Sequence, residues 1–162
     1  MNCKKLIKKL ALKPHPEGGY FKETYRSGNM FNTSWGKRNS STAIYYMLIG
    51  NDFSCFHRIK SDELWHHYYG CGIIIHEIKK DGKYEKHKLG IEKGFVPQII
   101  IEAKAWFAAE LNNKKSFSLA GCTVSPGFDF RDFEISEKEN LLSAYPEYKK
   151  IIKRFTRELP CS

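Results

Sequence analysis

Short apolar segments separated by turn residues fill the middle of this chain. They are rich in β-branched and aromatic residues, and turn signals such as Asn51-Asp52 and Asn112-Asn113 divide them. The expected strands are Tyr20–Tyr25, Thr42–Ile49, Phe53–Ile59, Glu63–Tyr69, Gly72–Ile78, Tyr84–Leu89, Pro97–Ile101, Ala105–Leu111 and Ser116–Val124. Regular short strands of this kind predict a β-barrel or a β-sandwich.

The N-terminal region has a different pattern. Leu6, Ile7 and Leu10 recur at helical spacing, which predicts a short amphipathic helix. The segment 13–19 (KPHPEGG) then contains two prolines and two adjacent glycines, so we expect it to end the helix in a fixed turn. Residues 27–40 are rich in Gly, Asn, Ser and Lys and predict an exposed loop.

The C-terminal region returns to helical spacing. Ser136 and Glu139 have the spacing of a capping box, in which each side chain bonds the backbone N–H of the other residue. Pro146 is suited to the first position of a following helix. We therefore expect two C-terminal helices packed on the outside of the strands.

Length and composition predict one globular domain over residues 1–162. Hydrophobic residues make up 41% of the chain, and no apolar run reaches the roughly 18–20 residues that a membrane span requires. Five cysteines form no CxxC pair, which indicates reduced thiols. We expect a cytoplasmic protein with no membrane partner.

The net charge is +9, but the lysines are spread along the chain and not gathered in a block with stacking aromatics. This favours a lysine-rich solvated exterior and no nucleic-acid partner. A basic field would still attract anionic metabolites.

The densest chemistry lies between Cys55 and Gly70, in the segment CFHRIKSDELWHHYYG. It contains three of the six histidines, an acidic pair, a tryptophan and two tyrosines. Strand alternation puts Glu63, Trp65 and His67 on one face and His66 on the other.

Several segments resemble the cupin superfamily, and within it the Cupin-5 or DUF985 family. They are LKPHPEGGYFKETYRS (12–27), STAIYY (41–46), FHRIKSDELWHHYYG (56–70), the start of the strand at 97–99 and CTVSPGFDFRDFE (122–134). The resemblance implies a mainly β, double-stranded β-helix (a jelly-roll barrel) with a short N-terminal helix and C-terminal helices. It also implies a homodimer and an architecture like that of the sugar-nucleotide epimerase branch.

Metal-binding cupins carry a Gly-x5-His-x-His-x3–4-Glu-x6-Gly motif. His57, Glu63 and Gly70 fall on that spacing, whereas Ile59 takes the second histidine position and Phe107 stands where the last histidine would be. A site with one imidazole and one carboxylate binds metal weakly. We therefore expect no cofactor; if a divalent metal is bound, its ligands would be His57, Glu63 and His67.

Without metal, His57 can act as a general base oriented by the Glu63 carboxylate. Aromatic, imidazole and guanidinium side chains would then form the rest of the binding site. The candidates for that role are Tyr25, Tyr45, Arg58, Trp65, His66, His67 and Phe107. Arg26, like Arg58, could pair with a phosphate or carboxylate of the ligand. Trp65 could equally be barrel filling, and Arg58 could equally form a surface ion pair with Asp62.

Three other groups have more ordinary interpretations. His15 and His76 are expected to be structural, and His87 to be solvated. The SPGFDFRDF segment could form the lip of a pocket, but the alternation of Phe128, Phe130 and Phe133 with Asp129 and Asp132 favours a strand that seals the barrel or a dimer seam.

The sequence thus predicts a cupin-type protein that binds a small polar, sugar-like or nucleotide-like metabolite in its barrel. One hypothesis is an isomerase or epimerase with His57 and Glu63 as catalytic residues. The alternatives are a non-catalytic binding or sensor protein, and a metal-dependent enzyme.

Overall fold

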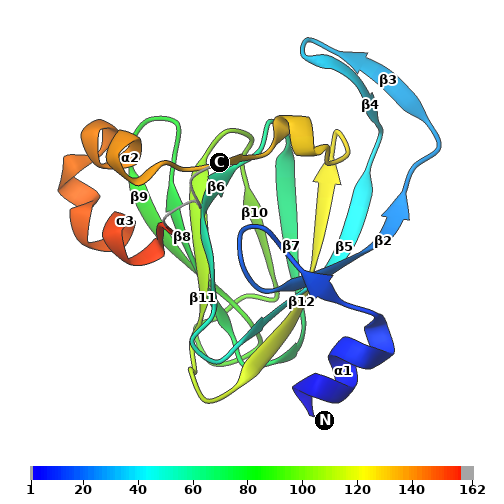
Figure 1. Cartoon of the computed structure of the whole chain (residues 1–162), viewed down its shortest axis with the longest axis vertical. Coiled ribbons are helices and arrows are strands. Elements are labelled where there is room, and N and C mark those ends of the chain that lie inside the picture. The colour runs from blue at the N-terminus through cyan, green and yellow to red at the C-terminus, as the bar shows by residue number, and fades with distance from the viewer. Residues whose placement is uncertain (1, 158–162) are drawn as a thin grey trace.

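Two antiparallel sheets curve toward each other to form a barrel in the computed structural model, which describes residues 2–157 (Figure 1). In spatial order, the first sheet contains β1 (Lys13–Pro14), β2 (Tyr20–Arg26), β5 (Thr42–Ile49), β12 (Phe117–Ser125), β7 (Asp62–Gly70) and β10 (Gln98–Ile101). The second contains β13 (Glu134–Ile135), β6 (Phe53–Arg58), β11 (Trp106–Leu111), β8 (Ile73–Ile78) and β9 (Tyr84–Leu89). The mainly β fold predicted from the sequence is confirmed.

The barrel interior is filled by alternate side chains of both sheets. Trp65, Ile75 and Phe107 are almost fully buried and belong to one apolar cluster. Because side chains of a strand alternate between its two faces, the next residues along these strands point to the outside of the barrel.

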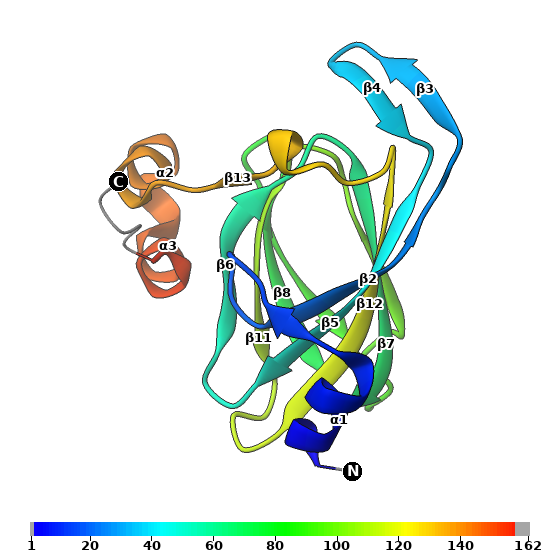
Figure 2. The same ribbon diagram turned by 45° about the vertical axis from the view of Figure 1, so that its right-hand side comes forward.

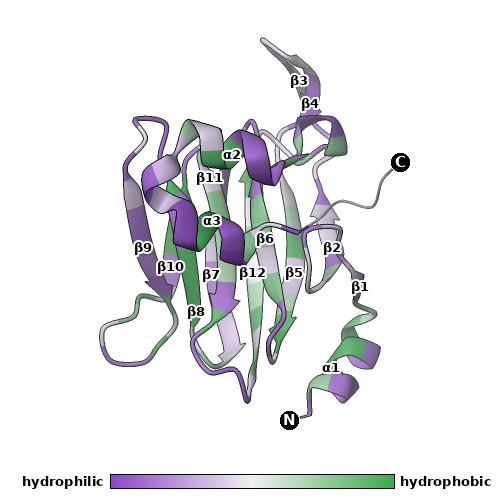
Figure 3. Cartoon of the chain, turned by 60° about the vertical axis from the view of Figure 1, so that its left-hand side comes forward, coloured by the Kyte–Doolittle hydropathy of each residue, from purple (hydrophilic) through white to green (hydrophobic). Residues whose placement is uncertain are grey.

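Helices cover part of each outer face. Figure 3 shows α2 (Lys138–Ala144) and α3 (Lys149–Phe155) lying across the second sheet, where Leu141, Ile152 and Phe155 are buried against it. Helix α1 (Cys3–Leu10) buries Leu6 against the first sheet. None of the helices in residues 2–157 is long and apolar enough to cross a membrane.

Two local predictions were wrong. Residues 27–40 contain a hairpin, β3 (Met30–Thr33) and β4 (Gly36–Asn39), which projects from the barrel (Figure 2). The capping box does not form, because the N-cap of α2 is Glu137 and it makes no side-chain cap bond. Ser136 instead continues the pairing with β6, since its backbone N–H donates to Phe56.

The C-terminal proline behaves as expected, because Pro146 begins a 3-10 turn, η2 (Pro146–Tyr148), that leads into α3. The four cysteines among the described residues are free, as predicted. Cys161 lies outside the described residues.

Candidate functional site

A cavity of about 310 Å³ opens at the end of the barrel from which the β3–β4 hairpin projects. The cavity is lined by side chains from the first sheet, from β6, from the turn before β2 and from the segment after β12. They are His15, Glu17, Phe21, Glu23, Arg26, Thr42, Ile44, Tyr46, His57, Ile59, Glu63, Cys122, Val124, Phe128, Asp129, Phe130 and Phe133. Its size is at the lower end of the range for small-molecule sites.

The turn between α1 and β2 carries two of the polar groups into this cavity. Gly18 and Gly19 have φ angles of 116° and 71°, which a residue with a Cβ rarely adopts. The Gly19 N–H donates to Asp52 Oδ2 at 2.8 Å, and the Tyr46 hydroxyl donates to the Gly18 carbonyl at 2.8 Å. These bonds hold the Glu17 side chain inside the barrel, where the residue is 5% exposed.

Glu17, and not Glu63, is the carboxyl partner of His57. His57 Nε2 lies 3.1 Å from Glu17 Oε2, and its Nδ1 lies 2.8 Å from the Cys55 carbonyl. A carbonyl can only accept, so Nδ1 carries a proton and Nε2 of the neutral ring faces Glu17. The Ser54 hydroxyl donates to Glu17 Oε1 at 3.0 Å.

Burial disfavours charge in this pair. Desolvation lowers the pKa of His57 to about 4 and raises the pKa of Glu17, although nearby His15 partly offsets the second effect. His15 Nδ1 lies 3.5 Å from Glu17 Oε2, and burial lowers its pKa as well. Both shifts favour uncharged side chains, and in the uncharged pair Glu17 donates its proton to Nε2 of His57.

Glu63 occupies a second position in the wall, on β7. Burial raises its pKa to about 8, and the nearby Glu17 adds to that effect. The Cys122 thiol and the Trp65 indole partly offset the rise. At neutral pH Glu63 is mostly a neutral carboxylic acid that can donate a hydrogen bond.

Aromatic rings surround the mouth of the cavity. Phe128, Phe130 and Phe133 contact one another with centroids 5.0–6.0 Å apart, and the last two also contact the His15 ring. The segment forms a 3-10 turn, η1 (Phe130–Asp132), and not a sealing strand. The interpretation favoured from alternation was therefore wrong, and the alternative of a pocket lip is the one observed.

A buried ion pair anchors this lip to the projecting hairpin. Asp132 accepts from Arg38 Nε and Nη2 at 2.6 and 2.7 Å, and both side chains are about 5% exposed or less. Arg26 ties the lip to β2 by donating to the Phe128 carbonyl at 3.1 Å.

Of the residues singled out in the sequence, His57, Glu63 and Arg26 line the cavity, and the structure does not bring the other seven into it. Two of them are core residues: Trp65 is 1% exposed beside Tyr46, and Phe107 packs on the His57 ring with centroids 4.1 Å apart.

Four others point away from the barrel interior. Tyr45 contacts Tyr68 on the outer face, and His66 lies near Thr123 on the same face. Arg58 donates to Glu134 at 2.7 Å and lies over the Trp106 ring, so its expected pairing with Asp62 is not observed. Tyr25 is 54% exposed.

A β-bulge explains why the Tyr25 side chain points outward. The pairing of β2 with β5 shifts between Glu23 and Tyr25, so the side-chain alternation changes phase there. Simple alternation would put Phe21, Glu23 and Tyr25 on one face. The bulge instead brings Arg26 to the cavity and turns Tyr25 outward.

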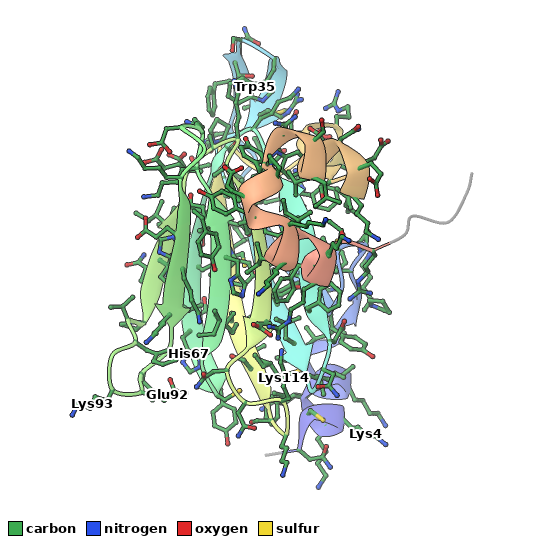
Figure 4. All side chains as sticks on the ribbon, turned by 90° about the vertical axis from the view of Figure 1, so that its left-hand side faces the viewer. Lys4, Trp35, His67, Glu92, Lys93 and Lys114 are labelled. Carbon is green, nitrogen blue, oxygen red and sulfur yellow. The ribbon has the colours of Figure 1, made fainter. Side chains whose placement is uncertain are left out.

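His67 lies toward the opposite end of the barrel from the hairpin that carries Trp35 (Figure 4), where its Nε2 is 3.3 Å from the Cys71 carbonyl. It is four residues from Glu63 on one strand, about 13 Å at 3.3 Å per residue. The two cannot share an ion with His57, so the predicted metal-ligand set was wrong.

The residues do not fit the metal site of metal-binding cupins either. Ile59, at the position of the second histidine ligand, lines the cavity. Phe107, at the position of the last histidine ligand, covers the His57 ring. Two of the four donors are thus replaced by hydrocarbon. Within residues 2–157, the His, Cys, Asp and Glu atoms that gather within 4.8 Å in a group of three or more belong to Glu77, Glu85 and His87.

That group lies on β8 and β9, and it corrects the prediction for His87. Its Nε2 is 2.7 Å from Glu77 Oε2, and its side chain is only 16% exposed. His76 is structural, as expected, between the Tyr84 hydroxyl at 2.7 Å and Glu110 at 3.2 Å.

The sequence analysis missed His15, Glu17 and Tyr46. The first two belong to the HPEGGYF string, which was interpreted as a turn and as part of the family resemblance, with His15 expected to be structural. A histidine and a glutamate two residues apart in a turn stiffened by prolines and glycines are a usable signal, because such a turn can hold both side chains in fixed positions.

Comparison with known proteins supports the family assignment. The chain matches the family described as "Cupin superfamily (DUF985)" over residues 4–136. It is 31% identical over 168 residues to the uncharacterized protein YML079W of Saccharomyces cerevisiae, covering 87% of this chain and 78% of that one.

Solved structures agree. A protein of Shewanella oneidensis, SO0799, is 35% identical with a TM-score of 0.90, covering 98% of this chain and 99% of that one. A hypothetical protein from Leishmania major is 32% identical with a TM-score of 0.92, covering 98% and 100%. Oxalate decarboxylase of Bacillus subtilis, at 12% identity, 92% and 40% coverage and a TM-score of 0.57, shares the fold. The chain therefore belongs to the DUF985 (Cupin_5) family of the cupin superfamily.

Proposed function

We propose that the barrel cavity binds a small polar, sugar-like or nucleotide-like metabolite and that His57 and Glu17 transfer a proton to and from it, as in an isomerase or epimerase. The observation that carries the proposal is the buried His57–Glu17 pair in the wall of a cavity of about 310 Å³. A cavity with a few convergent polar groups is the usual form of a small-molecule site.

The chemistry needs no further reactant. When the shared proton lies on His57 Nε2, the Glu17 carboxylate can take a proton from a ligand carbon next to a carbonyl. The proton then returns to the other face of that carbon or to a neighbouring carbon, so the product is an isomer. Glu63, as a neutral acid, can donate to the carbonyl oxygen on which negative charge develops.

The alternative is a non-catalytic binding protein. It is favoured by the low pKa of His57, about 4, because a base so far below neutral pH drives proton abstraction poorly. Both functions use the same cavity, and they differ in whether a carbon-bound hydrogen exchanges.

The test is deuterium incorporation. Aldoses and ketoses are incubated with the protein in D₂O, and proton NMR follows loss of the signal at the carbon next to the carbonyl. Exchange that disappears in His57→Ala and persists in His66→Ala, whose side chain lies on the outer face, supports an isomerase. Thermal stabilisation by a sugar without exchange supports the binding protein. If the protein shows neither exchange nor stabilisation with these sugars, both functions are refuted.

A further inference from the structure

Carboxyl groups outnumber cations in the cavity wall, on a chain whose net charge is +9. Four carboxyl side chains line the cavity, Glu17, Glu23, Glu63 and Asp129, whereas Arg26 is the guanidinium that lines it and no lysine does so among the described residues. The basic exterior therefore surrounds an interior rich in carboxyl groups.

The cavity guanidinium is already neutralised. Arg26 Nη2 lies 2.7 Å from Glu23 Oε2, its Nε lies 3.0 Å from Glu23 Oε1, and its Nη1 donates to Asn39 Oδ1 at 2.9 Å. Asp129 is likewise paired with Arg131, at 2.6 Å. Neither position offers a free positive charge to a phosphate or carboxylate ligand.

The two deep carboxyls lack a comparable cation. Glu17 faces His15, His57 and Ser54, and Arg157 acts on it only at longer range. Glu63 is influenced by Glu17, Cys122 and Trp65, none of which is a cation. An anion beside them would find no cation to neutralise it in a desolvated site, where charge interactions are strong, and it would keep both carboxyls from ionising.

The mouth of the cavity carries aromatic rings, which like the carboxyls favour a cationic ligand. Phe21, Phe128, Phe130 and Phe133 line the cavity, and the face of an aromatic ring attracts a cation. Aromatic rings at the entrance and carboxyls inside are the two groups that recognise an organic ammonium ion in proteins.

We propose that the ligand of this cavity carries a protonated amine, which is held by the Glu63 and Glu17 carboxyls behind the ring of phenylalanines. This rests on the proposed function only in that the cavity binds a small polar ligand. It narrows the ligand to an amine-bearing, sugar-like molecule and excludes nucleotides and sugar phosphates bound with the phosphate inside.

Binding should release a proton. In the free protein Glu63 holds a proton at neutral pH, and an ammonium group beside it favours the ionised form. The ammonium ion would thus replace a proton of the site, and the heat of binding would depend on the ionisation enthalpy of the buffer.

The experiment uses three probes of similar shape: glucosamine, glucose and glucuronate. Amide chemical shifts of the labelled full chain are followed by NMR titration near neutral pH. We expect glucosamine to bind at least about tenfold more tightly than glucose, a difference of about 1.4 kcal/mol, and glucuronate not to bind. Glu63→Gln should abolish this preference, whereas Glu134→Gln, which changes an exposed carboxyl on the outside, should leave it intact.

The outcomes are separable. If glucose or glucuronate binds as tightly as glucosamine, or if Glu63→Gln keeps the preference for the amine, this inference is overturned while the proposed function stands. If none of the three perturbs the resonances of cavity residues, both are rejected for sugar-like ligands. Calorimetry in two buffers adds a further check, because equal heats would mean that no proton is displaced.

Discussion

Glu63 shows how a single side chain can make stability depend on pH. Its pKa rises from 4.5 to about 8 because burial penalises the carboxylate. Between these values the unfolded chain releases the proton and the folded protein keeps it. The folded state is then progressively disfavoured as pH rises through that window.

The first prediction follows from that difference. Glu63→Gln keeps the shape of the neutral acid and removes its titration. We expect the free energy of unfolding of the variant, relative to the wild type, to increase between about pH 5 and 8, with a slope of up to about 1.4 kcal/mol per pH unit. Urea unfolding at several pH values measures it.

The comparison isolates Glu63 because His57 and Glu17 are present in both proteins. Glu134→Gln is the control, since this carboxyl is 53% exposed and should show no such trend. A constant difference between Glu63→Gln and the wild type across the pH range would show that Glu63 is not buried as a neutral acid.

The element that matters most to the site is the short turn before β2. Its backbone closes on itself, because Gly18 N–H donates to the His15 carbonyl and His15 N–H donates to the Gly19 carbonyl, both at 3.0 Å. The Cys55 N–H also donates to the Glu17 carbonyl at 2.8 Å, which fixes the turn against β6. A turn fixed in this way can hold Glu17 against His57 although Glu17 itself does not belong to a strand.

The second prediction concerns Gly18. An added Cβ would overlap the Phe53 carbonyl oxygen, and the φ of 116° is unfavourable for any other residue. We expect Gly18→Ala to destabilise the protein by about 1–3 kcal/mol and to weaken ligand binding, because the turn must move.

Gly28→Ala is the matched control, since nothing lies within 4 Å of the added atom and its φ needs no glycine. Unfolding midpoints in urea compare the two variants. Equal midpoints would mean that the turn is not constrained by its glycines.

At the scale of the whole molecule, one outer face is left with exposed aromatic and aliphatic groups. Tyr25, Tyr68 and Ile100 on the outside of the first sheet are 54%, 54% and 56% exposed. Helix α1 covers only the part of this sheet near Met47 and Leu119. Large exposed apolar groups gathered on one face are typical of interaction sites.

The third prediction is that two copies associate through this face. Light scattering after gel filtration should give a mass near twice 18.8 kDa. Tyr68→Lys together with Ile100→Lys should shift it toward 18.8 kDa, because a C2 interface meets each substitution twice. Met30→Lys, at a 48% exposed position on the β3–β4 hairpin, is the control, and a wild-type mass of one chain would contradict the proposal.

Much of the fold could be predicted because it depends on local pattern. The bounds of β5 and β9 agree with the expected strands, and the other strands from β6 to β12 differ by one or two residues. The hairpin β3–β4 was missed because its strands, MFNT and GKRN, carry polar residues on both faces and have no apolar alternation.

The candidate site was only half predictable. Its motif pointed to His57 and Glu63, but the carboxyl that contacts His57 comes from a turn 40 residues earlier in the chain.

The sequence by itself determined the strands, the family and the two groups carried by β6 and β7, because hydrophobic alternation and motif spacing are local properties. The tertiary structure decided which acid meets the imidazole, which tyrosine turns outward and which residues remain charged. Those outcomes depend on a bulge, on a glycine turn and on burial, and each arises only when distant segments pack together.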